Sequence, residues 1–497
     1  MVHTLALISS LSALLGLGPA PEARTDAPDA GKSAPAPLVQ ESADAAAGSE
    51  PDATEQAVAV APEQIIDAVL PCGLRVIAAK DASLPVAAVV LSIEVGTRDD
   101  PDKLPGLVHA LAYHLQQGNR ELGPGEAIAT THDVGGIVGM AVGPAQVRFE
   151  SLVPISALDA QLRVESLRLR APNTGRELWL KSLSYARNDD DVKLVVPREA
   201  AAAAWDDPGL AHDGRIVGQG LGDMLDQSVG AQLARLFDYR NATLVVVGPD
   251  DPQALLARVE PLFADLPARS RKPTASTIPP KPAAARTLAL PRQNGDTIVW
   301  AVAGTPQARA WAQVLCGTLN RQKRGVNDPP KSRVRCTYDD DPRRPLLVVR
   351  AIGFDVATGP EPMIAERLAR VADANAEPEL AALIEDQRAR VEQDLAYTLR
   401  APLELAGYLA STSEAHPGGQ PLRERGELLG LPSLPDPTEQ PGVNAATLLV
   451  AAIPQLLDTN TGVLLLSPEA AQPQPDTPAQ PDAAAQPDTP ETPEESQ

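Results

Sequence analysis

His109 and His114 are the pair of residues that most directly suggests metal chemistry. They lie in an apolar run, residues 107–117, whose spacing predicts a helix. Two histidines four residues apart can hold one zinc ion, because they then lie about 40° apart around the helix axis. These two are five residues apart, about 140° around the helix. Their side chains therefore diverge, and a shared metal would need a bulge in the helix. We expect His109 to be an interface or core histidine and His114 to be solvated.

Carboxylates that could complete a metal site follow a later helical segment, residues 177–186. Asp189, Asp190 and Asp191 form an acidic run there, which we interpret as a turn after the helix. The alternative is an altered zinc site in which one of these aspartates binds metal with His109 and His114. Ala112 argues against hydrolysis there, because alanine has no carboxylate to take a proton from water.

Motifs for other chemistry are missing from the sequence. It contains no glycine-rich dinucleotide or phosphate motif and no Gly-x-Ser-x-Gly nucleophile turn. The segment Gly218–Gly222 is glycine-rich, but Asp223 follows where a phosphate loop needs lysine and serine or threonine. His132, His212 and His416 are isolated, and we expect structural or solvated roles for them. No cofactor is predicted.

The composition argues against two classes of partner. The 497 residues carry 43 Lys and Arg against 65 Asp and Glu, a net charge of −22. Nucleic-acid binding needs clustered positive charge, so it is not expected. Attraction to an anionic membrane surface is not expected for the same reason. No apolar run reaches the roughly 18 residues of a membrane-spanning helix, so no integral membrane segment is expected.

Both ends of the chain differ from its middle. Residues 1–23 hold an apolar run followed by small residues, which favours a signal peptide and export to the periplasm or cell envelope. The alternative is a frayed N-terminus on a cytoplasmic protein. Residues 24–63 and 469–497 are acidic and rich in proline and alanine. We predict that both are disordered, because they bury too little apolar surface to offset ordering entropy.

The middle of the chain alternates strand and helix patterns. Aliphatic runs bounded by glycine or proline predict strands, and apolar residues at helical spacing predict helices. The proline-rich residues 269–285 predict a linker. The expected strands are 74–77, 86–91, 147–153, 243–247, 298–303 and 346–352, and the expected helices are 107–117, 156–169, 177–186, 252–263, 362–374 and 377–399.

An internal echo predicts two related halves. Residues 241–250 resemble residues 460–469, and Leu70-Pro71 recurs as Leu290-Pro291 at nearly the same offset. We therefore expect an α+β protein with two similar lobes, residues 64–268 and 286–468. Each lobe should be a mainly antiparallel sheet with helices packed on one face.

Three cysteines are too few for a disulfide framework. Cys316 and Cys336 could pair in an oxidising compartment. We favour buried free thiols instead, because an unpaired cysteine packs like a small apolar residue.

Several segments resemble the pitrilysin/insulinase-type (inverzincin) metallopeptidases, a family that includes the mitochondrial processing peptidases. Residues 70–77, Leu-Pro-Cys-Gly-Leu-Arg-Val-Ile, resemble the opening strand of that family, and residues 95–99, Val-Gly-Thr-Arg-Asp, resemble its Gly-Ser-Arg turn. Residues 105–109 with 118–119 frame the position of its zinc helix, and residues 240–248 resemble the segment that closes its first lobe.

The resemblance implies a degenerate His-x-x-Glu-His site. It places the first zinc ligand at His109, the general base at Ala112, the second ligand at Tyr113 and the third ligand at Asn188. Of these four, His109 alone has the family's residue type. The family's Gly-Gly-x-x-Asn-Ala strand, which pairs with peptide substrate, falls on residues 135–140, where Gly139 replaces the asparagine.

The joint loss of these positions favours a pseudoenzyme with no catalytic residue and no metal. The resemblance then implies a partner subunit of an active pitrilysin-like peptidase, which helps to form its chamber and hold peptide substrate. Two alternatives stay open. One is a stand-alone peptide-binding or envelope scaffold protein, and the other is a weak or altered zinc metallopeptidase.

Overall fold

A computed structural model gives the arrangement of the middle of the chain. Contacts between Cα atoms divide the chain into two units, residues 1–59 with 188–193 and all the rest. Of the first unit only Asn188 is described, and every helix and strand below belongs to the second. The structure describes residues 65–170, 175–188, 198–216, 220–271, 286–289, 297–302, 306–324, 329–339, 345–354, 361–412, 442–457 and 463–466, with a few positions between 431 and 440.

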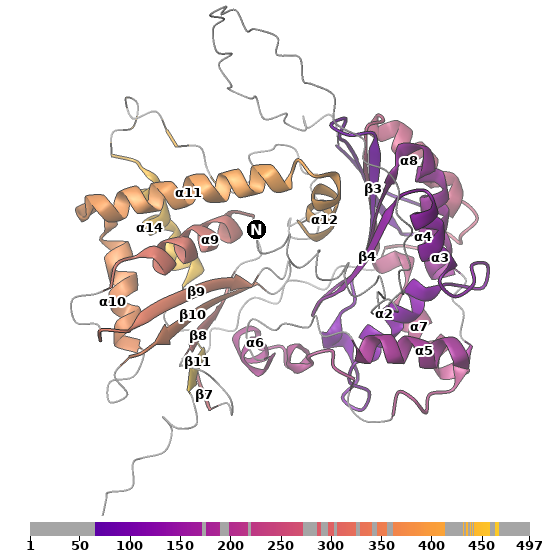
Figure 1. Ribbon diagram of the computed structural model, residues 1–497, viewed down its shortest axis with the longest axis horizontal. Helices are drawn as coiled ribbons and strands as arrows, with labels where there is room; N and C mark the ends of the chain where they lie inside the picture. The colour runs from indigo at the N-terminus through magenta and orange to yellow at the C-terminus, as the bar shows by residue number, and fades with distance from the viewer. Residues whose placement is uncertain are drawn as a thin grey trace, which may run out of the picture. The chain divides into compact units, whose positions relative to one another are not determined.

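The first half of the chain builds a six-stranded sheet in the order β1-β2-β6-β3-β5-β4 (Figure 1). Neighbouring strands are antiparallel, apart from the parallel pair β2 and β6. Every residue of β6 is buried, as expected for a strand that is covered on both faces. The strands are β1 (Ile65–Val69), β2 (Arg75–Lys80), β3 (Val86–Ile93), β4 (Ile137–Val142), β5 (Val147–Pro154) and β6 (Ala242–Gly248).

Helices of the same half, apart from α6, pack along one face of this sheet or beside it. Side chains alternate between the two faces of a strand, and in β3 the residues Val89 and Leu91 join the core formed with α2, α4 and α8. Figure 1 shows these helices along the sheet. The helices are α2 (Leu107–Gln117), α3 (Glu126–Asp133), α4 (Leu158–Arg170), α5 (Arg176–Arg187), α6 (Arg198–Trp205), α7 (Asp226–Leu236) and α8 (Pro252–Phe263), with 3-10 turns η2 (Thr97–Asp99), η3 (Ile155–Ala157), η4 (Pro208–Ala211) and η5 (Tyr239–Asn241).

The second half builds a five-stranded sheet in the order β7-β11-β8-β10-β9. Its core is formed largely by apolar residues of the strands with those of α9, α11 and α14. The strands are β7 (Arg286–Ala289), β8 (Thr297–Ala301), β9 (Arg333–Asp339), β10 (Leu346–Ile352) and β11 (Val463–Leu466). The helices are α9 (Pro306–Arg321), α10 (Glu361–Ala372), α11 (Pro378–Thr398), α12 (Pro402–Thr412) and α14 (Ala445–Leu456), with the turn η6 (Ala374–Ala376).

The two sheets share one topology. The order and directions of β2-β6-β3-β5-β4 recur in β7-β11-β8-β10-β9, including the parallel first pair. This confirms the expected α+β fold with two similar lobes. In the repeated topology, β6 and β11 occupy equivalent positions, as the similarity between residues 241–250 and 460–469 predicts. The Leu-Pro echo does not align the strands, because Leu70 precedes β2 whereas Leu290 follows β7.

Among the described elements, one helix also contacts the second face of each sheet. Helix α12 packs on β3, β5 and β6, where Ala406 and Leu409 join one core with Ala88 and Val90. Helix α6 packs on β8 and β11 in the same way, through alanines such as Ala200. The sequence predicted helices on one face of each sheet, and the structure adds a helix on the other face. Strands with aliphatic residues on both faces need cover on both.

The cysteines differ from the favoured hypothesis. Cys316 on α9 and Cys336 on β9 form a disulfide, with their Cα atoms 4.7 Å apart. The hypothesis of two free thiols was wrong because α9 packs directly against β9, a contact that spacing in the sequence does not reveal. Cys72 is a buried free thiol, as predicted.

Most expected elements are confirmed, and α2, α8 and β10 begin and end at the expected residues. The boundaries of the lobes stay predictions. The start of the predicted linker lies against the first sheet, where Arg271 donates to Glu94 at 2.7 Å and to the carbonyl oxygen of Ala242 at 2.6 Å. Residues 1–23, 24–63 and 469–497 lie outside the described residues. Among the described helices, none has the length and apolar character needed to cross a bilayer.

Candidate functional site

The helix expected to carry the metal site, α2, has a start that is fixed by tertiary contacts. Gly106 precedes the helix with a φ of 80°, in the left-handed region that favours glycine. A Cβ at this position would lie 2.6 Å from the Cγ1 atom of Ile216. The Asp100 carboxylate accepts hydrogen bonds from the backbone N–H groups of Gly106 at 2.8 Å and Val108 at 2.7 Å. Asp100 therefore caps the helix by reaching it from a preceding turn.

Asp100 is the one described acid whose pKa is strongly raised. Burial raises the pKa of its carboxyl to about 6, although the backbone N–H groups of Val108 and Gly106 and the nearby His212 and His109 oppose that rise. The side chain is 5% exposed, so desolvation of the charged form dominates. The capping contact is thus sensitive to pH.

The two histidines of α2 do not point to one site. His109 is buried, and its Nδ1 atom lies 3.3 Å from the carbonyl oxygen of Gly214. His114 was expected to be solvated, and that expectation is wrong: it is fully buried, edge-on to the Trp179 ring and 3.4 Å from Ser182 Oγ. The five-residue spacing turns it toward α5, as the angle around the helix implies.

The remaining positions on α2 do not fit a zinc ion. Ala112 is completely buried and brings no donor atom. The ring of Tyr113 lies between His109, at 5.4 Å between ring centres, and Tyr185, at 6.3 Å. A phenol with an ordinary pKa of about 10 is a poor zinc ligand at neutral pH. Within the described ranges, no three His, Cys, Asp or Glu side chains form a group that could hold a metal.

The structure describes only some of the other candidates from the sequence. Asn188 is an exposed residue in a bend directly after α5, and Asp189, Asp190 and Asp191 lie outside the described residues. His132 is exposed at the end of α3. His212 is not isolated, because its Nε2 atom lies 3.4 Å from the Asp102 carboxylate. His416 lies outside the described residues.

The glycine-rich segment after residue 217 provides backbone carbonyls for packing rather than a phosphate site. The carbonyl oxygen of Leu221 accepts a hydrogen bond from Trp179 Nε1 at 2.8 Å. The carbonyl oxygens of Gly222 and Met224 accept from Arg176. Residues 217–219 lie outside the described part of the chain.

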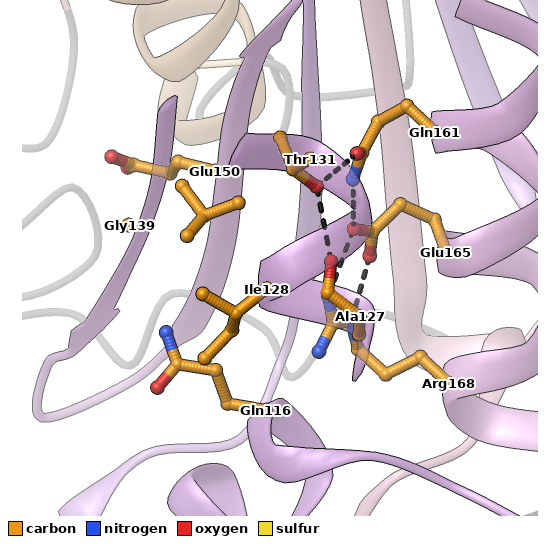
Figure 2. A pocket seen from close by; sticks show the side chains of 10 residues that line it. Gln116, Ala127, Ile128, Thr131, Gly139, Glu150, Gln161, Glu165 and Arg168 are labelled. Atoms are coloured by element: carbon orange, nitrogen blue, oxygen red, sulfur yellow. Dashed lines mark hydrogen bonds and ion pairs between the residues drawn. The ribbon is translucent and has the colours of Figure 1, made fainter. Parts of the chain in front are cut away.

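A small pocket beside β4 is lined in part by side chains that form a hydrogen-bond network (Figure 2). Thr131 Oγ1 donates to Gln161 Oε1 at 2.7 Å, and Gln161 Nε2 donates to Glu165 Oε1 at 3.0 Å. Arg168 completes the network through Glu165 and the carbonyl oxygen of Leu115. The remaining space admits roughly one water molecule, so it is no pocket for a small-molecule substrate. The lining residues are Gln116, Ala127, Ile128, Thr131, Val138, Gly139, Glu150, Gln161, Glu165 and Arg168.

Strand β4 covers most of the residues that the sequence resemblance places on the family's peptide-pairing strand, and it is one of the two edge strands of its sheet, opposite β1. Gly139 lies opposite Glu150 of β5 in the register of the two strands. A Cβ on Gly139 would approach only Glu150, at 3.7 Å from Oε2. The sequence singled out Gly139 but missed Glu150, because pairing between strands is what brings the carboxylate next to the glycine.

The two repeated α+β lobes have the fold of pitrilysin-like, or M16-type, peptidases, as their similarity to solved structures shows. No protein-family model matches the sequence, and no curated protein matches it either. Solved structures do match the fold. A protease from Helicobacter pylori has a TM-score of 0.60 at 14% identity, over 81% of this chain and 99% of that chain.

Two further structures bear on the class. The first half of the periplasmic protease PqqL from Escherichia coli matches with a TM-score of 0.60 at 15% identity, over 82% of this chain and 93% of that chain. A peptidase M16 inactive domain from Pseudomonas fluorescens matches with a TM-score of 0.60 at 13% identity, over 81% of this chain and 97% of that chain. The fold is thus shared by proteins described as proteases and by one described as inactive.

Proposed function

We propose that this protein is a non-catalytic pitrilysin-like scaffold that holds peptide, and that it serves as the partner subunit of an active zinc peptidase. The observation that carries the proposal is the state of α2. The helix is packed and capped, yet the resemblance assigns its base position to Ala112, which is fully buried, and its second ligand position to Tyr113, which stacks on Tyr185. The fold is retained, while a residue set for activating water is not.

Peptide holding is supported by the open strand β4. An edge strand presents unpaired backbone N–H and C=O groups, and an extended peptide can add to it as a further strand. The residues of β4 are at least partly exposed, with Ile137 at 43%. Two of the similar structures are described as proteases, whose substrates are polypeptides, and that supports the same ligand class here.

Export is part of the proposal. The apolar residues 1–23 favour a signal peptide, and a similar structure is described as a periplasmic protease. The disulfide between Cys316 and Cys336 adds support, because disulfides persist in oxidising compartments such as the periplasm.

Elemental analysis combined with a peptide-hydrolysis assay tests the non-catalytic part. The full chain purified alone should contain no stoichiometric zinc and should cleave no unstructured peptide. Stoichiometric zinc with chelator-sensitive cleavage would overturn the proposal and favour the altered peptidase that uses His109, His114 and an aspartate of 189–191.

The partner role has its own test. Cross-linking in the native host should join this chain to a zinc peptidase with an intact His-x-x-Glu-His site, and adding the purified chain should raise the activity of that peptidase. Peptide binding without any such effect would favour the stand-alone peptide-binding or envelope scaffold instead.

A further inference from the structure

The exposed edges of the two sheets differ in their chemistry. Strand β9, at one edge of the second sheet, places Arg333 and Arg335 in solvent. Charged side chains on an edge strand disfavour pairing with another strand. Strand β4 has the sequence Ile-Val-Gly-Met-Ala-Val, without a charge or a proline. It therefore lacks the features that protect β9, and no strand in the described part of the chain pairs with its outer edge.

The register of β4 and β5 decides which backbone groups of β4 face outward. The N–H of Gly143 donates to the carbonyl oxygen of Gln146 at 2.8 Å, so these two residues form a hydrogen-bonded pair. Hydrogen-bonded and non-hydrogen-bonded pairs alternate along an antiparallel ladder. Gly139 is thus hydrogen-bonded to Glu150, while Val138 and Met140 direct their N–H and C=O groups to the open edge.

The Glu150 carboxylate extends over Gly139 toward this edge, and Figure 2 shows the two residues side by side. One oxygen, Oε1, lies 3.1 Å from the Nε atom of Arg148, and the side chain is 17% exposed. The other oxygen, Oε2, lies 3.7 Å from the point that a Cβ of Gly139 would occupy. Any larger side chain at position 139 would stand between this oxygen and a peptide at the edge.

We infer that β4 and Glu150 form a subsite for extended peptides that carry a lysine or arginine opposite Gly139. The inference rests on the proposed peptide-holding function and adds the side-chain preference of the docked segment. A residue directly opposite Gly139 would share its sheet face, in a close non-hydrogen-bonded pair. Its basic side chain extends past Gly139, which has no side chain, and reaches the Oε2 atom of Glu150.

Fluorescence anisotropy with synthetic probes tests this subsite on the full chain. The probes are three labelled nonapeptides of alternating threonine and valine, with lysine, norleucine or glutamate at the centre. The lysine peptide should bind about three- to ten-fold more tightly than the norleucine peptide, and the glutamate peptide should bind most weakly. Glu150→Gln should remove the preference for lysine and leave norleucine binding unchanged. Glu260→Gln, on an exposed position of α8, is the matched control and should keep the preference.

A second variant distinguishes peptide binding at β4 from the preference for a basic residue. Met140→Pro removes an N–H that faces the open edge, and proline is tolerated at such positions, so it should abolish binding of all three probes. Met140→Leu keeps the N–H and should bind like the wild type. Binding without a lysine preference would overturn the basic subsite and leave the proposed function standing. Absence of binding by every probe, or a dimer of this chain that Met140→Pro dissolves, would overturn both.

Discussion

Glu165 and Arg168, one turn apart on α4, form an ion pair that is almost completely removed from solvent. Arg168 Nε donates to Glu165 Oε2 at 2.8 Å, and the side chains are 8% and 2% exposed. The guanidinium also lies over the Phe149 ring, 4.2 Å from its centre, and donates to the carbonyl oxygen of Leu115. Through Arg168, the pair connects α4 to α2 and to strand β5.

Removal of one partner of this pair should be costly. Glu165→Ala leaves a buried guanidinium without its counter-charge, so the free energy of unfolding should fall by about 3–5 kcal/mol. Urea unfolding followed by circular dichroism measures the change. The exposed pair Arg163 and Glu121 supplies the control, because Glu121→Ala should have little effect. Equal small effects at both sites would show that Arg168 finds another partner.

The pKa of Asp100 predicts a specific dependence of stability on pH. Its folded-state pKa of about 6 lies above the ordinary value of 3.8, so the folded protein binds the proton more tightly than the unfolded chain. The contribution of Asp100 to stability therefore falls as pH rises from about 4 to about 6, by about 2–3 kcal/mol.

Asp100→Asn removes this titration. Between pH 4 and pH 7 the free energy of unfolding of the variant should rise relative to that of wild type by about that amount, because wild type alone loses this stability as Asp100 ionises. Urea titrations at half-unit pH steps measure it. Asp223→Asn, on an exposed residue, is the control. Parallel profiles for Asp100→Asn and wild type would contradict the prediction.

A carboxylate placed at position 112 should not create zinc chemistry. Ala112 is fully buried in the packed face of α2, so Ala112→Glu places a carboxylate in an apolar environment and should cost about 2–4 kcal/mol. The zinc content should stay at the wild-type level. Ala129→Glu, on an exposed position of α3, should leave stability nearly unchanged. Zinc uptake by Ala112→Glu, seen by elemental analysis, would refute the prediction.

The disulfide should stabilise the second sheet. Cys316 and Cys336 are 20 residues apart in the chain, and closing a loop of that size contributes about 3 kcal/mol. Reductant should lower the melting temperature of the wild type, whereas the double variant Cys316→Ala/Cys336→Ala should not respond to it. Cys72→Ala should keep the response. Peptide mapping without reductant would show free thiols at 316 and 336 if the pairing is wrong.

The elements that the sequence predicts well are those with local causes. Helix α8 begins where Asp251 accepts a hydrogen bond from the N–H of Gln253 and Pro252 occupies the first turn. Helix α2 ends at Gly118, a residue type that commonly stops helices. Such signals depend on neighbours a few residues away, so they can be recognised in the sequence alone.

The candidate site was predictable only in outline. The mismatched ligand spacing of His109 and His114, the missing carboxylate at 112 and the glycine at 139 are all matters of residue identity. The burial of His114 against Trp179, the position of Glu150 beside Gly139 and the raised pKa of Asp100 are not. Each depends on a partner far away in the chain or on how much water the fold excludes.

By itself, the sequence determined that this is an acidic chain, and it predicted an α+β fold with a repeated strand pattern and a helix over residues 107–117 with alanine at 112 and tyrosine at 113. The tertiary structure alone decided that Cys316 meets Cys336, that α12 and α6 cover the second faces of the sheets, and that a carboxylate lies at the open edge beside Gly139. The physical reason is the distance along the chain over which each interaction acts. Propensity, capping and periodicity act over a few residues, whereas pairing register, packing and desolvation are set by the whole fold.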